Sequence, residues 1–220
     1  MITEALRLET ILPPAGLSLV AVIALVWCDF HQIRPGRYLF KPLAAAAFVW
    51  LAMALGATGS TYGCWLLAGL LCCMAGDLLL MPDSERSFLA GLIAFLSGHL
   101  LYGVAFLKLQ VNLQGLALSC LPALVLLVVA VRWLGPHINR EMKLPVALYT
   151  LVITAMLLCA GLSAGHPAAA LIIGGAWGFA ISDLAVARQQ FAHPSPLNGM
   201  WGTPLYFFSQ MLLAGSVAFA

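Results

Sequence analysis

The sequence predicts an all-α integral membrane protein, a bundle of eight transmembrane helices joined by short loops. Hydrophobic residues make up 63% of the 220 residues and charged residues only 8%, whereas soluble domains carry about 25% charged residues. The apolar residues also gather into eight runs, each close to the ~20 residues that a helix needs to cross the hydrocarbon core. We expect one membrane domain over residues 1–220, with no soluble domain attached.

The eight runs follow one another at short intervals. We expect spans at about 11–29, 41–57, 63–81, 87–107, 115–134, 144–162, 167–187 and 201–219. Gly, Pro and polar residues separate them, in the segments RPGRY, GATGSTYG, MPDSERS, QVNLQG, GPHINREMK, SAGHP and HPSPLNG, and such segments form turns. The first run is expected to be retained as a span, because MITEALRLET has mixed charge and does not resemble the basic start of a cleaved signal peptide.

The basic residues predict how the bundle is oriented. With these spans only Arg7 and Lys108 fall on one side, and the other side holds Arg34, Arg37, Lys41, Arg86, Arg132, Arg140, Lys143 and Arg188. Cytoplasmic loops are enriched in Lys and Arg, so we expect the richer side to be cytoplasmic and both termini to be non-cytoplasmic. The expected location is a multi-pass membrane protein, in the inner membrane if the source is bacterial.

Charge and cysteine content argue against several other classes of protein. A net charge of +2 without any basic tract does not favour nucleic-acid binding. The six cysteines lie in or beside apolar runs and form no CxxC pair, so we interpret them as buried thiols and not as zinc ligands. No metal and no cofactor is predicted, and the sequence indicates no oligomeric state.

Two aspartates are the main candidates for a functional site. Asp77 lies in LLAGLLCCMAGDLLLMP and Asp183 in AALIIGGAWGFAISDLAVAR. A charged residue at membrane depth costs about 2.5–3.5 kcal/mol on insertion scales, so it is a functional candidate by default. Both residues are expected about 7 Å inside the cytoplasmic boundary, because Asp77 lies five residues before Pro82 and Asp183 five before Arg188, at about 1.5 Å per residue.

Other polar residues are expected on the same side of the membrane. Lys41 opens the second span, His99 and Tyr102 form an i, i+3 pair in the fourth, and Tyr206 and Gln210 belong with Thr203 to one stripe on the eighth. Such stripes turn toward the bundle interior or a wet cavity, so the site is predicted in the cytoplasmic half. Each residue also has a purely structural interpretation.

These structural interpretations differ from residue to residue. Lys41 could extend to the membrane surface or form a buried ion pair with an aspartate. His99 could be a hydrogen-bonded packing residue, Tyr206 part of an aromatic belt, and Gln210 a hydrogen-bonded link between helices.

These segments together resemble the lysoplasmalogenase family, also called the YhhN family, of eight-span membrane proteins. The matching pieces occur in the family's order over nearly the whole chain: FKP, GDLLLM, GHLLYGVAF, ISDLAVARQQF and YFFSQ. The resemblance implies an ether hydrolase that takes a lysophospholipid from the bilayer. With water, it would cleave the vinyl ether bond of a lysoplasmalogen to a fatty aldehyde and glycerophosphocholine or glycerophosphoethanolamine.

The resemblance also implies roles for individual residues. Asp77 and Asp183 match the family's intramembrane aspartates, and its recurrent polar positions are matched by Lys41, His99, Tyr102, Tyr206 and Gln210. A vinyl ether is hydrolysed by protonation at its β-carbon, which needs a proton donor and a nearby negative charge, as in the carboxylate pair of a glycosidase. Two neighbouring carboxyls in a poorly solvated site favour one protonated and one ionised form.

Two other functions remain open from the sequence. A small-solute or proton-coupled transporter could use the same aspartates to bind a proton or a cation. A zinc-dependent membrane hydrolase usually needs several intramembrane ligands, whereas only one His lies within a span.

Overall fold

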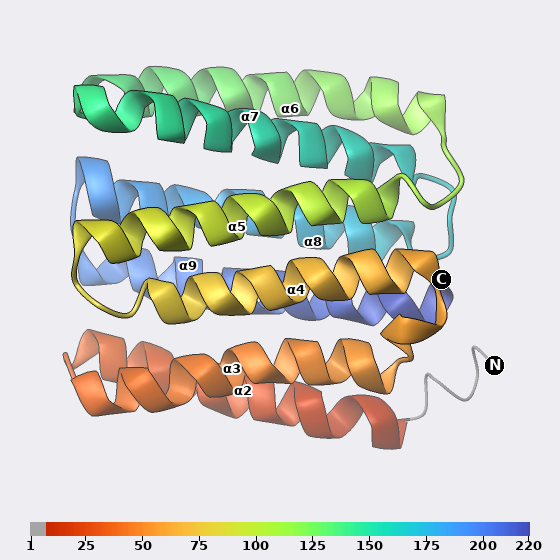
Figure 1. The fold of residues 1–220 in the computed structure, drawn as a ribbon, viewed down its shortest axis with the longest axis horizontal. Coiled ribbons are helices and arrows are strands. Elements are labelled where there is room, and N and C mark those ends of the chain that lie inside the picture. The colour runs from red at the N-terminus through yellow and green to blue at the C-terminus, as the bar shows by residue number, and fades with distance from the viewer. Residues whose placement is uncertain (1–7) are drawn as a thin grey trace.

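The computed structural model describes residues 8–220, and within them the chain forms eight long helices and no strand (Figure 1). Their bounds are α2 Leu8–Phe30, α3 Arg34–Ala54, α4 Thr61–Leu79, α5 Glu85–Phe106, α6 Leu113–Leu134, α7 Arg140–Leu162, α8 Ala169–Ala187 and α9 Pro196–Gly215. Short helical turns connect or extend them: η1 Ala57–Gly59, η2 Gly135–His137, η3 Arg188–Ala192 and η4 Ser216–Phe219. The predicted all-helical bundle is confirmed.

Seven of these helices are long and apolar enough to cross a membrane. They are α2 to α8, and they make the chain an integral, multi-pass membrane protein. Helix α9 has 20 residues but is less apolar, because it carries Asn198, Ser209 and Gln210. All three of these side chains are buried, so α9 packs with its polar face toward the bundle. Arg7, which entered the orientation argument, lies outside the described residues.

Consecutive helices pack as antiparallel hairpins, which are visible in Figure 1 as the pairs α2/α3, α4/α5, α6/α7 and α8/α9. Helix α9 also contacts α2, α3 and α4, and α7 contacts α5 and α8. Helix α6 lies at the edge of the bundle and packs mainly on α7. The connections after α2, α4, α6 and α8 all lie at the left end of the view.

Several helix starts follow from local capping. The side chains of Ser60, Ser84, Asn112 and Ser195 each accept a backbone N–H in the first turn of the helix that follows, which satisfies donors that have no partner inside a helix. Helix α3 begins at Arg34 and not near residue 41, because Pro35 occupies its first turn, where a fixed φ favours helix. Lys41 therefore lies within α3.

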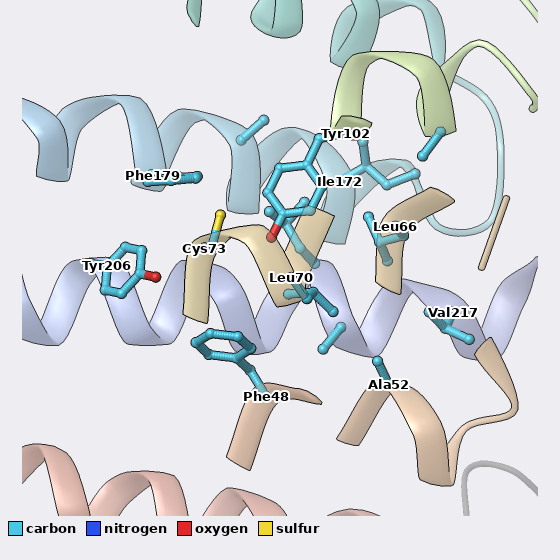
Figure 2. Close-up of a cluster of buried hydrophobic side chains, with 14 of the residues drawn as sticks. Phe48, Ala52, Leu66, Leu70, Cys73, Tyr102, Ile172, Phe179, Tyr206 and Val217 are labelled. Atoms are coloured by element: carbon cyan, nitrogen blue, oxygen red, sulfur yellow. The ribbon is translucent and has the colours of Figure 1, made fainter. Parts of the chain in front are cut away.

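The core sits between the central helices and includes large side chains from several of them. Figure 2 shows Phe48, Leu70, Tyr102, Phe179 and Tyr206 converging there, and all five are buried.

Close approach of α4 and α5 supports this core. A Cβ on Gly69 would meet the ring of Tyr102, and one on Gly98 would meet Sγ of Cys73. These glycines let the two helices approach closely, a common means of packing helices in membranes. Nearer Asp77, Gly91 of α5 lies against Leu80 and the carbonyl oxygen of Gly76 in the same way.

Candidate active site

Asp77 and Asp183 line the same cavity, which has a volume of about 670 Å³. Asp77 lies near the end of α4 and is 2% exposed, and Asp183 lies near the end of α8 and is partly buried. The cavity reaches the exposed residues Asp83 and Ser84 between α4 and α5. It is therefore accessible from the end of the bundle that holds the α4–α5 and α8–α9 connections.

Asp77 is held by two donors from two other helices. Nζ of Lys41, on α3, lies 3.3 Å from Oδ1, and the hydroxyl of Tyr206, on α9, donates to Oδ2 at 2.7 Å. Both oxygens of this carboxyl thus face a donor. Both contacts offset part of the cost of burying a negative charge at this position.

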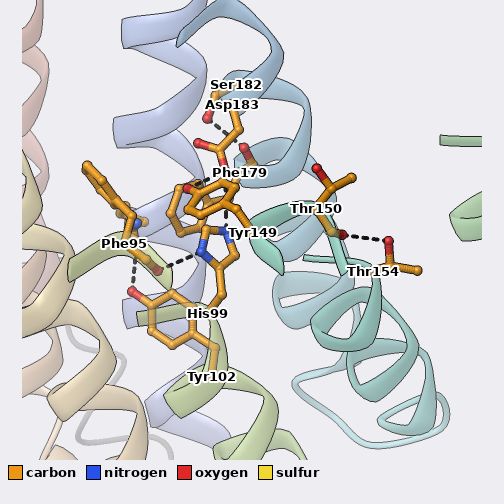
Figure 3. Close-up of polar contacts among 10 residues, drawn as sticks. Phe95, His99, Tyr102, Tyr149, Thr150, Thr154, Phe179, Ser182 and Asp183 are labelled. Carbon is orange, nitrogen blue, oxygen red and sulfur yellow. Dashed lines mark hydrogen bonds and ion pairs between the residues drawn. The ribbon is translucent and has the colours of Figure 1, made fainter. Parts of the chain in front are cut away.

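Asp183 has a different pair of partners, both on the same oxygen (Figure 3). The hydroxyl of Tyr149, on α7, donates to Oδ2 at 2.9 Å. Nε2 of His99, on α5, lies 3.4 Å from the same oxygen. Within residues 8–220, Oδ1 of Asp183 makes no side-chain hydrogen bond or ion pair. Oδ1 is therefore the Asp183 oxygen that is free to interact with a molecule bound in the cavity.

The orientation of His99 is determined by the groups around it. Its ring stacks on Phe179 with centroids 4.2 Å apart, and Nδ1 lies 2.7 Å from the carbonyl oxygen of Phe95. A carbonyl only accepts hydrogen bonds, so Nδ1 carries a hydrogen. Nε2 then faces Asp183 and makes no hydrogen bond to any described residue. Nε2 and the carboxyl oxygen are both acceptors, so they attract each other only when one of the two groups carries a proton.

Tyr102 and Gln210 form a third group, one layer behind the cavity. The Tyr102 hydroxyl donates to Oε1 of Gln210 at 2.6 Å and so joins α5 to α9. Both side chains are fully buried, and neither they nor His99 line the cavity. The predicted set therefore divides into cavity residues (Lys41, Asp77, Asp183 and Tyr206) and residues behind the wall (His99, Tyr102 and Gln210).

Tyr149 was missed by the sequence analysis. It lies in LPVALYTLVIT, an apolar helix without a charged residue beside it. Thr150 and Thr154 are the other polar residues there, and their hydroxyls bond to backbone carbonyls of the preceding turn. A tyrosine has no such local partner, so a buried one needs an acceptor elsewhere. The need of this tyrosine hydroxyl for a distant acceptor was the one feature of the sequence that could have indicated its role.

The cavity has a charged end and an apolar arm. The charged end is lined by Asp29, Arg37, Lys41 and Asp77. The arm is lined by aliphatic side chains of α5, α6 and α7: Leu92, Leu126, Leu127, Ala130, Leu134, Val146 and Ile153. Asp183 and Tyr149 line the cavity as well. A cavity with these two chemistries fits a molecule that has a polar head and a hydrocarbon chain.

The described residues contain no group of three or more His, Cys, Asp and Glu side chains arranged to hold a metal ion. Around the two aspartates, the cavity offers their carboxyls, the Lys41 amine and the phenols of Tyr149 and Tyr206, while the His99 imidazole lies behind the wall. Such a set can transfer protons and stabilise a cation.

Comparison with known proteins adds a second line of information. The model of the YhhN family matches residues 36–217. Lysoplasmalogenase TMEM86B of Homo sapiens is 32% identical over 183 residues, which cover 78% of this chain and 69% of that protein. The Sus scrofa protein of the same name is 33% identical over 205 residues, covering 90% and 82%, and that of Rattus norvegicus is 34% identical, covering 78% and 67%. No solved structure matches the chain.

Proposed function

This chain belongs to the YhhN family, and we propose that it is a lysoplasmalogenase that hydrolyses the vinyl ether bond of lysoplasmalogens at the cavity shared by Asp77 and Asp183. The observation that carries the proposal is the position of both carboxyls in a cavity that has a charged end and an apolar arm. The curated relatives, which are named lysoplasmalogenases, support the same reaction.

The two ends of the cavity determine the direction in which the substrate binds. The alkenyl chain occupies the arm between α5, α6 and α7, and the glycerophospho group lies toward Arg37 and Lys41. The vinyl ether then lies near the two aspartates. Closely packed, water-poor surroundings strengthen electrostatic interactions with a developing charge, so a carboxylate here stabilises a cationic transition state more than it would in water.

Asp183 is the proposed general acid. Its Oδ1 has no side-chain partner among the described residues, and its Oδ2 accepts from Tyr149 and lies 3.4 Å from Nε2 of His99. In the first step Asp183 transfers a proton to the β-carbon of the vinyl ether, and the electron pair of the double bond forms the new C–H bond. The α-carbon becomes an oxocarbenium ion, and Asp183 becomes a carboxylate.

Asp77 is the proposed stabiliser of that cation. The hydrogen bond from Tyr206 and the charge of Lys41 stabilise the negative charge of its carboxylate. Water adds to the α-carbon and gives a proton to the Asp183 carboxylate, which forms a hemiacetal. The hemiacetal hydroxyl then gives up its proton, the bond to the glycerol oxygen breaks, and that oxygen takes up one proton as the fatty aldehyde leaves. The sum is the addition of one water molecule, and Asp183 ends in its starting state.

We further propose that the charged end of the cavity faces the cytoplasm. Arg34, Arg37 and Lys41 belong to that end of the bundle, as do Arg86 and Arg188, and the positive-inside tendency supports this orientation. The substrate would then enter from the cytoplasmic leaflet, and both termini would face the other side.

The reaction is tested with three substrates that differ at one bond. Purified protein is incubated with 1-alkenyl-glycerophosphoethanolamine, its saturated 1-alkyl ether and its 1-acyl ester. We expect fatty aldehyde from the alkenyl lipid and no product from the other two. Release of fatty acid from the ester would contradict the proposed bond specificity. Aspartate-dependent solute flux into liposomes without any hydrolysis would instead favour a transporter.

A further inference from the structure

Four charged side chains line the charged end of the cavity with alternating sign. Asp77 pairs with Lys41, and Arg37 pairs with Asp29, with Nε and Oδ1 3.7 Å apart. Arg37 and Lys41 lie four residues apart on α3, so they occupy one face of that helix. In the proposed mechanism Lys41 and Asp77 take part in the chemistry and the glycerophospho group lies toward Arg37, but Asp29 has no role.

The Asp29–Arg37 pair differs from an ordinary surface ion pair. Both side chains are 34% exposed and line the cavity. Arg34 and Asp83, 3.8 Å apart on the same end of the bundle, are 83% and 73% exposed, and only Asp83 of this pair lines the cavity. The second pair is solvated, whereas the first lies where a bound molecule would meet it.

Arg37 is also oriented for a further partner. Its Nη2 donates to the carbonyl oxygen of Leu80 at 3.3 Å, at the end of α4, while Nε is directed toward Asp29. A guanidinium has five N–H donors in a planar fork, so donors remain after these two contacts. Such a guanidinium can bind one phosphate group through two parallel N–H···O hydrogen bonds.

We propose that Arg37 and Asp29 form a subsite for a zwitterionic phospholipid headgroup, in which Arg37 binds the phosphate and Asp29 binds the ammonium group. This inference rests on the proposed function, because it assigns the headgroup of the same substrate. The order of groups in the lipid supports it: hydrocarbon chain, vinyl ether, glycerol, phosphate, amine. The cavity presents matching chemistries: an apolar arm, Asp77 paired with Lys41, and, four residues earlier on α3, Arg37 paired with Asp29.

The subsite favours a headgroup that carries both a phosphate and an ammonium group. A phosphate next to Arg37 replaces Asp29 as its anionic partner, and the lipid ammonium replaces Arg37 as the cationic partner of Asp29. Both protein charges stay compensated when the zwitterion binds. A headgroup that ends in a phosphate monoester leaves Asp29 beside additional negative charge, which is unfavourable.

The experiment compares three alkenyl lipids: 1-alkenyl-glycerophosphoethanolamine, 1-alkenyl-glycerol-3-phosphate and 1-alkenylglycerol. The expected result for Asp29→Asn is a KM about tenfold higher for the ethanolamine lipid, a lower KM for the phosphate monoester, and an unchanged KM for 1-alkenylglycerol. For Arg37→Gln we expect a KM about tenfold higher for both phosphate-bearing lipids and no change for 1-alkenylglycerol. Arg34→Gln is the matched control, and its KM values should equal those of the wild type.

A binding measurement separates this inference from the proposed function. Two saturated 1-alkyl ethers, 1-alkyl-glycerophosphoethanolamine and 1-alkyl-glycerol-3-phosphate, are titrated into the protein in detergent micelles. These ligands lack the vinyl ether, so binding is measured without hydrolysis. Weaker binding of the ethanolamine ether to Asp29→Asn supports the subsite even if no aldehyde forms with any substrate, an outcome that would overturn the hydrolase alone. Equal binding and equal KM values in wild type, Asp29→Asn and Arg37→Gln would overturn the subsite and leave hydrolysis intact.

Discussion

Nε2 of His99 and Oδ2 of Asp183 lie 3.4 Å apart, although the two residues come from different helices and are 84 positions apart in the chain. The ring is oriented by the Phe95 carbonyl and by Phe179. Tyr149 reaches the same carboxyl oxygen from a third helix. Side chains from two other helices therefore surround one oxygen of this carboxyl, and this arrangement leads to the first prediction.

Tyr149→Phe removes one hydrogen bond from Asp183 without changing the shape of the side chain greatly. We expect kcat for aldehyde release to fall about tenfold with little change in KM, because a hydrogen bond to a charged group contributes about 1.5–3 kcal/mol. The measurement is steady-state hydrolysis in detergent micelles. Tyr38→Phe, at an exposed tyrosine of α3 outside the cavity, is the control and should behave as wild type. Full activity in Tyr149→Phe would show that this tyrosine does not act on the reacting carboxyl.

The class of fold was predictable from the sequence, because long apolar runs have few alternatives in a membrane. Helix ends were less predictable. Helix α3 begins at Arg34 and α9 at Pro196, before the expected starts near 41 and 201, since each has a proline in its first turn and the helix extends beyond its most apolar stretch.

Partners within the site could not be read from the sequence. The chain offers Lys41, His99 and several tyrosines to two aspartates, and depth alone does not say which meets which. The assignment depends on how each helix is rotated: α7 turns Tyr149 toward α8, and α9 turns Tyr206 toward α4. Rotation is determined by packing between helices distant in sequence, such as α5 against α7.

The second prediction concerns the Lys41–Asp77 pair. The side chains are 16% and 3% exposed, so Lys41→Met leaves Asp77 with an uncompensated buried charge. We expect a loss of unfolding free energy of about 3–5 kcal/mol, measured by thermal unfolding in detergent. Asp77→Asn added to Lys41→Met should restore most of it, since the double variant has no unpaired charge.

Whether Lys41 and Asp77 interact directly is tested by comparing the loss of unfolding free energy in the double variant with the losses in the two single variants. Losses that simply add, with no recovery in the double variant, would contradict a direct interaction. Activity should be absent from the double variant even where stability returns, because Asp77 is needed to stabilise the cation.

The third prediction tests the close contact of α4 and α5. In Gly98→Ala the new methyl group would lie against Sγ of Cys73 and near the carbonyl oxygen of Gly69. We expect a destabilisation of about 1–3 kcal/mol and reduced activity, because the neighbouring His99 moves with α5. Gly16→Ala, where nothing lies within 4 Å, is the matched control and should be neutral. Removing the sulfur in Gly98→Ala/Cys73→Ala should recover part of the loss; no recovery would mean that the strain lies elsewhere.

The fourth prediction follows from protonation at carbon. In heavy water the fatty aldehyde should carry one deuterium at carbon 2, and in oxygen-18 water the glycerophosphoethanolamine should carry no label, since water adds to the oxocarbenium ion. Mass spectrometry of both products measures this. Unlabelled aldehyde incubated under the same conditions corrects for later exchange. Oxygen-18 in the glycerol product would indicate attack on the glycerol carbon and contradict the mechanism.

The most direct test of the account is the initial rate of aldehyde release by Asp183→Asn and Asp77→Asn, compared with wild type and with the exposed control Glu141→Gln. Each protein is first matched for thermal unfolding and for binding of the saturated ether. The account predicts a fall of about a thousandfold in both aspartate variants, as for loss of a general acid or its partner charge, and wild-type rates in Glu141→Gln. Wild-type rates in both aspartate variants would contradict a reaction at this pair of carboxyls.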